Sequence, residues 1–170
     1  MKAGNFVKSF LTSLALIVFL VQSCTSQTPT NAPKNVPEFT FFTLKGNKTV
    51  TRTNLALQGN IVFIFFDPGC SHCRTDMKGI NDNFDEFNNA NFYLVSQHDP
   101  MLVTDFLNTY AKDIQNKANV HVLLDKNYEF LVKFQPRQYP ALYVYGPDRT
   151  LKSFLEGGNP IGKILEAVNK

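Results

Sequence analysis

Two cysteines separated by two residues, Cys70 and Cys73, are the side chains in this sequence best suited to chemistry. Two intervening residues place both sulfurs within one helical turn, where they can form and break a disulfide with each other. One thiolate can attack a disulfide in another molecule, and the second thiol can then resolve the mixed disulfide. Zinc sites share this spacing but usually need a second pair of ligands. Disulfide exchange is therefore the favoured chemistry, and neither step requires a cofactor.

The segment around the pair indicates which sulfur performs which step. An uninterrupted apolar run at 61–66 predicts a strand that is buried on both faces, and Asp67-Pro68-Gly69 ends it. Residues with helical spacing follow, namely Cys73, Met77, Ile80, Phe84 and Phe87. Cys73 lies on this apolar stripe and should be covered. Cys70 lies at the helix N-terminus, where unpaired N–H groups and the helix dipole favour a thiolate, so we expect Cys70 to be the nucleophile and Cys73 the resolving thiol.

The buried strand, short loop, cysteine pair and helix together resemble a thioredoxin-fold oxidoreductase. The sequence is most similar to the TlpA/ResA-like group of membrane-tethered bacterial thiol-disulfide oxidoreductases, over residues 37–170. Residues 39–50 fit the N-terminal hairpin of that group, and residues 99–125 resemble its extra helix-strand unit. The resemblance implies an α/β, thioredoxin-like fold: a central mixed sheet flanked by helices, with an N-terminal β-hairpin and an inserted helix-strand unit.

Local patterns predict the remaining elements of this fold. Strands are expected at 92–96, 120–124, 141–145 and 151–155, and short helices after Asp99, from Tyr128 and near the C-terminus. The first two of these strands are each reached through a helix, which favours a parallel arrangement. Asp99 before Pro100, and Asn159 before Pro160, each have the composition of a helix N-cap followed by the first helical residue.

Two titratable residues near the pair could adjust its protonation. His72 lies between the cysteines, and a protonated imidazole there would stabilise the thiolate and make the couple more oxidising. The alternative is a solvated histidine that has little effect on the thiol pair. Of the two, we favour a histidine that adjusts the protonation of the pair. Asp76 occupies a position where TlpA/ResA-like proteins often carry an acid that assists proton transfer. A surface acid that stabilises the first helical turns through the dipole is an equally good interpretation of Asp76.

Tyr139 and Pro140 are expected to shape the substrate groove. They match the family segment in which a cis proline packs beside the disulfide. Such a proline keeps metal away from the thiols and leaves the backbone of Tyr139 free to pair with an extended substrate. The alternative is an ordinary trans proline at a strand edge, and the resemblance favours the cis form.

The N-terminal residues predict export. Lys2 and Lys8 precede an apolar run at 14–21, which is short for a membrane span, and Cys24 follows. This pattern resembles a lipoprotein signal, in which Cys24 is lipidated; an ordinary cleaved signal or an uncleaved anchor are the alternatives. If Cys24 is lipidated, the two remaining cysteines, Cys70 and Cys73, can pair with each other and no odd thiol is left. The predicted organisation is a lipoprotein-type signal peptide at 1–23, a flexible tether at 24–36 and a thioredoxin-like domain at 37–170.

Together these features predict an exported thiol-disulfide oxidoreductase of the bacterial cell envelope, lipid-anchored and facing the periplasm. The resemblance implies that it reduces disulfides of partner proteins with electrons from a membrane-embedded, DsbD-like donor. A net charge of +3 without interleaved basic and aromatic residues gives no indication of nucleic-acid binding. Two alternatives stay open: a Sco-like copper chaperone, in which His98 and His121 join Cys70 and Cys73, and a redox-inactive thioredoxin-fold binding module.

Overall fold

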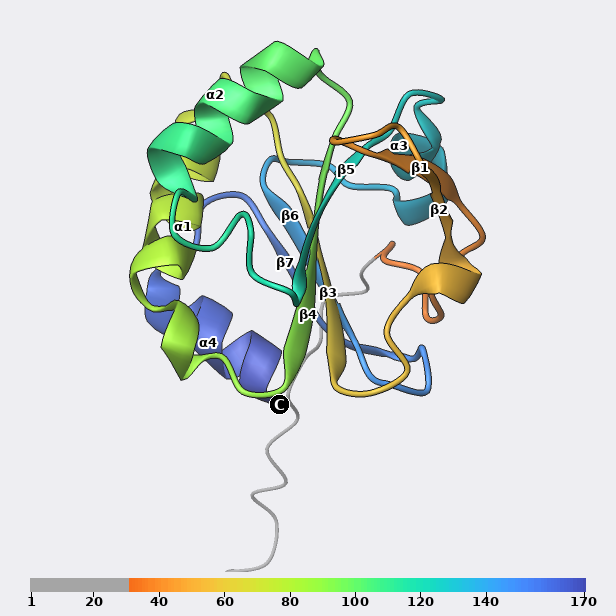
Figure 1. The fold of residues 1–170 in the computed structure, drawn as a ribbon. Helices are drawn as coiled ribbons and strands as arrows, with labels where there is room; N and C mark the ends of the chain where they lie inside the picture. Colours follow the sequence, from red (N-terminus) through yellow and green to blue (C-terminus); the bar gives the residue numbers. More distant parts are fainter. Residues whose placement is uncertain (1–30) are drawn as a thin grey trace, which may run out of the picture.

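A computed structural model describes residues 31–170 and shows one mixed sheet with helices on both faces (Figure 1). Its seven strands run in the order β2-β1-β5-β4-β3-β6-β7. The strands are β1 (Thr40–Thr43), β2 (Thr49–Thr51), β3 (Asn60–Phe65), β4 (Ala90–Ser96), β5 (Val120–Leu124), β6 (Ala141–Tyr145) and β7 (Leu151–Glu156). The helices are α1 (Ser71–Asp82), α2 (Pro100–Tyr110), α3 (Glu129–Phe134) and α4 (Ile161–Asn169), with short 3-10 turns at Arg52–Asn54 and Phe84–Glu86. The predicted architecture, including the N-terminal hairpin β1–β2 and the inserted unit α2–β5, is confirmed.

Strand β3 lies inside the sheet between β4 and β6. Both of its faces are buried, as its apolar sequence predicts. It pairs in parallel with β4 and antiparallel with β6, and β5 continues the parallel arrangement beyond β4. The carboxyl ends of β3, β4 and β5 therefore meet at one edge of the sheet. The cysteine loop, the pair Gln97-His98 and the side chain of Asp125 all follow strands at this edge.

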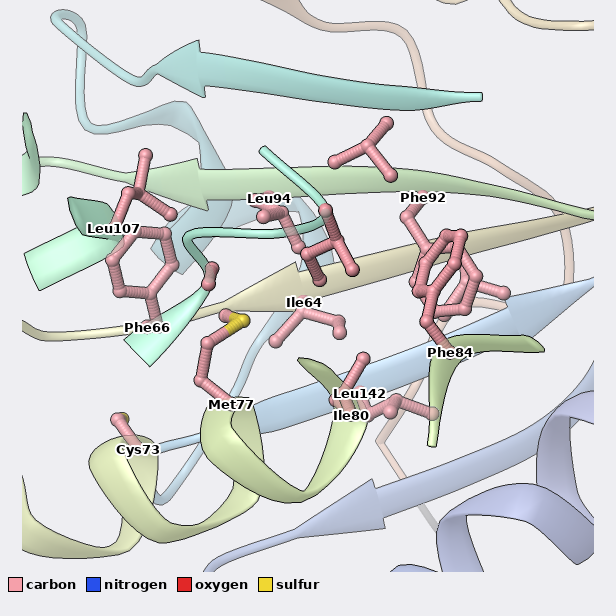
Figure 2. Packing of buried hydrophobic residues seen from close by; sticks show 14 of the residues in the cluster. Ile64, Phe66, Cys73, Met77, Ile80, Phe84, Phe92, Leu94, Leu107 and Leu142 are labelled. Atoms are coloured by element: carbon pink, nitrogen blue, oxygen red, sulfur yellow. The ribbon is translucent and has the colours of Figure 1, made fainter. Parts of the chain in front are cut away.

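The two faces of β3 contribute to different cores. Val62 and Ile64 belong to the core beneath α1, α2 and α4, and Figure 2 shows Cys73, Met77 and Ile80 on α1 directed toward the sheet. The other core is mostly aromatic and lies under α3 and the hairpin; it includes Phe39, Phe41, Phe63, Phe65, Phe130, Phe134 and Tyr143. Burial of each large apolar side chain stabilises the fold by roughly 1.5–3 kcal/mol. Helix α1, which carries the cysteine pair, is thus held firmly on the sheet.

The last residues of the predicted tether pack on the domain. Val36 is buried and donates its N–H to the carbonyl of Arg149 at 3.1 Å, while Leu151 donates to the carbonyl of Lys34 at 2.8 Å. Residues 34–36 therefore run beside the start of β7 and belong to the folded domain, ahead of the boundary predicted at residue 37. The predicted signal peptide, Cys24 and the first part of the predicted tether lie outside the described residues. Within residues 31–170, no helix is both long and apolar enough to cross a membrane.

The start of α4 differs by one residue from the prediction. Asn159 was expected to cap this helix, but the helix begins at Ile161 and Pro160 occupies the cap position. Asn159 instead donates its backbone N–H to Asp76 and its side-chain amide to the carbonyl of Gly157 at 2.7 Å. A contact with a distant helix, which local sequence spacing cannot reveal, thus fixes the orientation of Asn159.

Candidate redox site

The cysteine pair lies where β3 passes into α1. Cys70 is the N-cap residue of α1 and is half-buried, whereas Cys73 is 1% exposed and faces the core. Asp67 shapes the loop before them: its carbonyl accepts the N–H of Cys70 at 3.1 Å, and its Oδ1 accepts the N–H of Gly69 at 2.6 Å. Both thiols are free, and their side chains are in hydrogen-bond contact. The pair is therefore reduced, with one sulfur presented and one covered, as the helical spacing predicts.

Burial decides the protonation of Cys73. Loss of water around the sulfur raises the pKa of the Cys73 thiol far above its usual range, and the backbone N–H of Asp67, which donates to this sulfur, opposes the rise. The contact with Cys70 and the charge of the Asp67 carboxylate raise the pKa further. Cys73 is consequently a neutral thiol at neutral pH, and it must lose a proton before it can act as a nucleophile.

Tyr139 lies beside the thiol pair and precedes Pro140 in the chain. The Tyr139–Pro140 peptide bond is cis, as the resemblance implies, and Pro140 is buried. The Sγ of Cys70 donates to the carbonyl of Tyr139 at 3.7 Å. The ring of Tyr139 packs on Phe65 with centroids 5.1 Å apart. Among the described residues, Tyr139 makes no backbone–backbone hydrogen bond, so the edge of the chain beside Cys70 is open.

Asp76 is a buried acid, so its interpretation as a surface acid is wrong. Its side chain is covered by the loop before α4, and both carboxylate oxygens accept the backbone N–H of Asn159. Burial raises the pKa of Asp76 to about 6, while the N–H of Asn159 and the nearby charge of His72 act in the opposite direction. A cavity of about 10 Å³ separates Asp76 from Pro140, and this is close to the size of one water molecule.

His72 is exposed on the first turn of α1 and lies against the loop between β7 and α4. A Cβ atom at Gly158 would lie only 2.5 Å from the Nδ1 of His72, so the close approach of this loop requires a glycine. Gly158 and Asn159 are parts of the site that sequence reasoning missed. The pair Gly157-Gly158 was the available signal, because two consecutive glycines suggest a place where the backbone approaches another group closely.

Two polar residues after β4 border the other side of the site. Gln97 donates its Nε2 to the hydroxyl of Tyr139 at 3.2 Å, and the Nε2 of His98 lies 3.2 Å from the Oδ2 of Asp67. This contact does not have hydrogen-bond geometry, and it is an ion pair only when the imidazole of His98 is protonated. The Nε2 of His98 and the Oε1 of Gln97 are buried and have no hydrogen-bond partner among the described residues.

The structure separates the two histidines of the copper-site alternative. His98 borders the thiol loop, but His121 stacks on Tyr93 with ring centroids 4.8 Å apart and lines a cavity of about 300 Å³ at the edge of β5. Burial lowers the pKa of His121. Nowhere in residues 31–170 do three His, Cys, Asp or Glu side chains converge as metal ligands. The described residues thus offer the copper-site alternative no ligand set.

Comparisons with known proteins identify the family of the chain and support its fold. Residues 33–154 match the sequence model described as the AhpC/TSA family. A comparison with functionally curated sequences found no significant match.

Among solved structures, the chain is similar to a secreted Mycobacterium tuberculosis disulfide oxidoreductase homologous to E. coli DsbE, with a TM-score of 0.62, 18% identity, and 76% of this chain and 93% of that chain covered. StoA from Bacillus subtilis gives a TM-score of 0.58 at 14% identity, covering 79% of this chain and 98% of that one. The peroxidoxin BcpB from M. tuberculosis gives 0.64 at 14% identity, covering 81% and 95%. At such identities these structures establish the thioredoxin-like fold.

Proposed function

The chain belongs to the AhpC/TSA family, and from that premise we propose that it is a thiol-disulfide oxidoreductase that exchanges disulfides with partner proteins. It is a thioredoxin-like redox protein with a Cys70–Cys73 pair. One observation carries the proposal: the half-buried sulfur of Cys70 lies at the entrance of α1, in contact with the fully covered sulfur of Cys73. Such an arrangement suits one thiol for attack and the other for resolution.

The proposed reaction transfers two electrons from the thiol pair to a substrate disulfide. The Cys70 thiolate attacks one sulfur of the substrate, the substrate S–S bond breaks, and its second sulfur leaves as a thiolate. Cys73 then loses its proton and attacks the Sγ of Cys70, which breaks the mixed disulfide and releases the other substrate sulfur. Cys70 and Cys73 end as a disulfide, and the substrate ends as two thiols after protonation.

Asp76 is the proposed proton acceptor for Cys73. The thiol needs a base because burial holds its pKa far above neutral, and a carboxyl with a pKa of about 6 is mostly ionised at neutral pH. Cys73 and Asp76 are three residues apart on α1 and share its buried face. The water-sized cavity that Asp76 and Pro140 help to line leaves room for one water beside the carboxylate. His72, whose charge acts on Asp76, tunes this step in our proposal.

The surroundings of Cys70 favour a protein substrate. Tyr139 makes no backbone–backbone hydrogen bond beside the Cys70 sulfur, so in our proposal its backbone pairs with an extended segment of the substrate next to Pro140. Large exposed apolar side chains lie on the elements that follow β4 and β5 at the same edge of the sheet: Met101, Leu102, Tyr128, Leu131 and Val132. Exposed apolar surface at the sheet edge that carries the cysteine loop is consistent with docking of another protein.

The proposed setting is the periplasmic side of a bacterial envelope, with a lipid on Cys24 as the anchor. This part of the proposal is supported only by the sequence pattern of residues 1–24. In an oxidising compartment a reductant must be reduced again, so the proposed partner besides the protein substrates is a membrane-embedded dithiol donor of the DsbD-like type. Two electrons from that donor would return the Cys70–Cys73 disulfide to two thiols.

Peroxide reduction is a second candidate, favoured by the matching family and by the structural likeness to a peroxidoxin. In that reaction the Cys70 thiolate attacks the peroxide O–O bond, giving a sulfenic acid and releasing an alcohol or water after protonation. Condensation of the sulfenic acid with the Cys73 thiol then releases water and forms the same Cys70–Cys73 disulfide.

Insulin reduction with dithiothreitol as the electron source tests the main proposal. Wild type should accelerate reduction, Cys70→Ser should fall to the uncatalysed rate, and Cys73→Ser should accumulate a mixed disulfide through Cys70. Consumption of hydrogen peroxide under the same conditions tests the second candidate. Faster peroxide consumption without insulin reduction would replace the main proposal. Failure of both, with a Cys70–Cys73 pair that does not cycle, would leave a redox-inactive binding module.

A further inference from the structure

Two consecutive residues, Gln97 and His98, contact the two halves of the thiol site. Both follow β4, the strand that lies beside β3 in the sheet. The amide of Gln97 donates to the hydroxyl of Tyr139 at 3.2 Å, on the proline side of the site. The imidazole of His98 approaches the carboxylate of Asp67 at 3.2 Å, on the thiol side. One short loop thus touches both segments that border the reactive sulfur.

Asp67, which His98 contacts, also interacts with both cysteines. Its carbonyl accepts the N–H of Cys70, its carboxylate accepts the N–H of Gly69, and its backbone lowers the pKa of the Cys73 thiol. The charge of the same carboxylate disfavours the Cys73 thiolate. The position and the charge of Asp67 therefore influence both thiols.

Tyr139, which accepts a hydrogen bond from Gln97, also contacts the sulfur of Cys70. Its carbonyl accepts the Sγ–H of Cys70, and its ring rests on Phe65. The hydrogen bond from Gln97 holds the far end of the ring, so the backbone of Tyr139 is fixed between the core and the Cys70 sulfur.

We propose that Gln97 and His98 are positioning residues that hold the Tyr139 and Asp67 sides of the thiol site, and that charge on His98 offsets the Asp67 carboxylate. This proposal deepens the proposed disulfide exchange and rests on it. Protonated His98 cancels part of the negative field at the thiols, so a thiolate forms more readily as the imidazole becomes charged. Stabilising the thiolate stabilises the reduced pair, which makes the couple more oxidising at lower pH.

The groups around this contact set the size of the effect. Asp67, Cys70, Cys73 and Asp125 all act electrostatically on the Tyr139 hydroxyl, and Asp99 caps α2 immediately after His98. Three of these groups are carboxyls. Positive charge near the thiol loop comes from Arg74, which donates to the carbonyls of Pro68 and Gly69, and from His72, which acts on Asp76; a protonated His98 adds positive charge directly at the Asp67 carboxylate. The side chains of His98 and Asp67 are 33% and 30% exposed, so water screens the pair and the effect should be a few-fold.

Two unpaired atoms support a role for this loop beyond packing. The Oε1 of Gln97 and the Nε2 of His98 are buried, and neither has a hydrogen-bond partner among residues 31–170. Buried polar atoms in folded proteins are nearly always paired, so two unpaired atoms on adjacent residues require an explanation. The contacts of the same two side chains with Tyr139 and Asp67 provide one, because they hold each side chain in place without pairing these atoms.

The pH dependence of Cys70 alkylation by iodoacetamide tests the role of His98. It requires only the reduced protein, so its outcome is independent of whether insulin is reduced. Between about pH 8 and about pH 5.5, His98→Gln should lose reactivity faster than wild type, reaching a rate about threefold lower at the acidic end. Asp67→Asn should react faster than wild type at about pH 8, because it removes the opposing charge. The control variant is His121→Gln, which alters a half-buried histidine away from the thiols. Its alkylation rate should depend on pH as that of wild type does.

Superimposable profiles for wild type and His98→Gln, or an equal change in His121→Gln, would overturn the charge role. If His98→Gln fails to fold by circular dichroism, His98→Asn replaces it.

The role of Gln97 is tested with Gln97→Leu, Tyr139→Phe and the double variant, through their reduction potentials against glutathione. The single variants should shift the thiol–disulfide equilibrium constant similarly, by about twofold to fivefold, and the double variant should shift it no further. Additive effects would show that Gln97 does not act through the Tyr139 hydroxyl.

Discussion

Both carboxylate oxygens of Asp76 accept one backbone N–H, that of Asn159, at 3.2 and 3.1 Å. The contact joins α1, which carries the cysteines, to the loop before α4. A single N–H is a weak substitute for the hydration that a carboxylate loses on burial, so burial dominates and the pKa of Asp76 rises to about 6. Asp76 therefore changes charge just below neutral pH, one helical turn beyond the resolving thiol.

Replacing Asp76 with asparagine should stabilise the reduced protein at neutral pH. Folding raises the pKa of this acid, so the folded state binds its proton more tightly, and the contribution to stability falls as pH rises from about 4 through about 6. A pKa change from about 4 to about 6 corresponds to roughly 2–3 kcal/mol. Urea unfolding should show Asp76→Asn more stable than wild type near pH 7.5, with the gap closing near about pH 4. A gap that is constant with pH would contradict the raised pKa.

The same substitution should slow disulfide exchange although it stabilises the fold. Without a base for the Cys73 thiol, resolution of the mixed disulfide should slow by about tenfold to a hundredfold at neutral pH. Insulin turnover measures this step, whereas alkylation of Cys70 should hardly change. Asp82→Asn, which removes an exposed acid at the end of α1, is the matched control and should retain wild-type turnover. Equal losses in the two variants would remove Asp76 from the proposed mechanism.

Local spacing predicted the cysteine half of the site well. The phase of Cys73, Met77 and Ile80 on one helix determines which sulfur is covered, and the apolar run before Asp67 determines a strand buried on both faces. Both are properties of a continuous segment, for which periodicity is an adequate guide. The parallel pairing of β3, β4 and β5 was predicted as well, because each connection between these strands contains a helix.

Contacts between distant segments could not be predicted in this way. Asp76 and Asn159 are 83 residues apart, and His98 meets Asp67 only because β4 ends beside β3. A sequence identifies these residues as polar groups near element ends, but it does not give the register that brings them together. Asn159 was accordingly interpreted as a helix cap, and His98 only as a ligand of the alternative copper site.

Asp125 should be essential to the stability of α3. It is fully buried, and its carboxylate accepts the N–H groups of Glu129 and Phe130 at 2.9 and 2.8 Å, at the start of this short helix. Asp125→Ala leaves both N–H groups unpaired and should cost about 2–4 kcal/mol in urea unfolding. Asp125→Asn keeps one acceptor oxygen and should cost clearly less. Similar losses in both variants would indicate that charge or packing, rather than these hydrogen bonds, matters at this position.

Gly158 should be required for the close packing of the β7–α4 loop on His72. A Cβ atom at Gly158 would lie 2.5 Å from His72 Nδ1 and 3.0 Å from its Cγ, so Gly158→Ala must displace the imidazole or the loop. We expect a loss of about 1–2 kcal/mol in urea unfolding. In a His72→Ala background the loss should disappear, because the clashing ring is gone. Gly162→Ala is the matched control: its Cβ would meet nothing within 4 Å on α4, and it should stabilise the fold by roughly 0.5–1 kcal/mol. An undiminished loss in the His72→Ala background would place the role of Gly158 in its backbone rather than in its contact with His72.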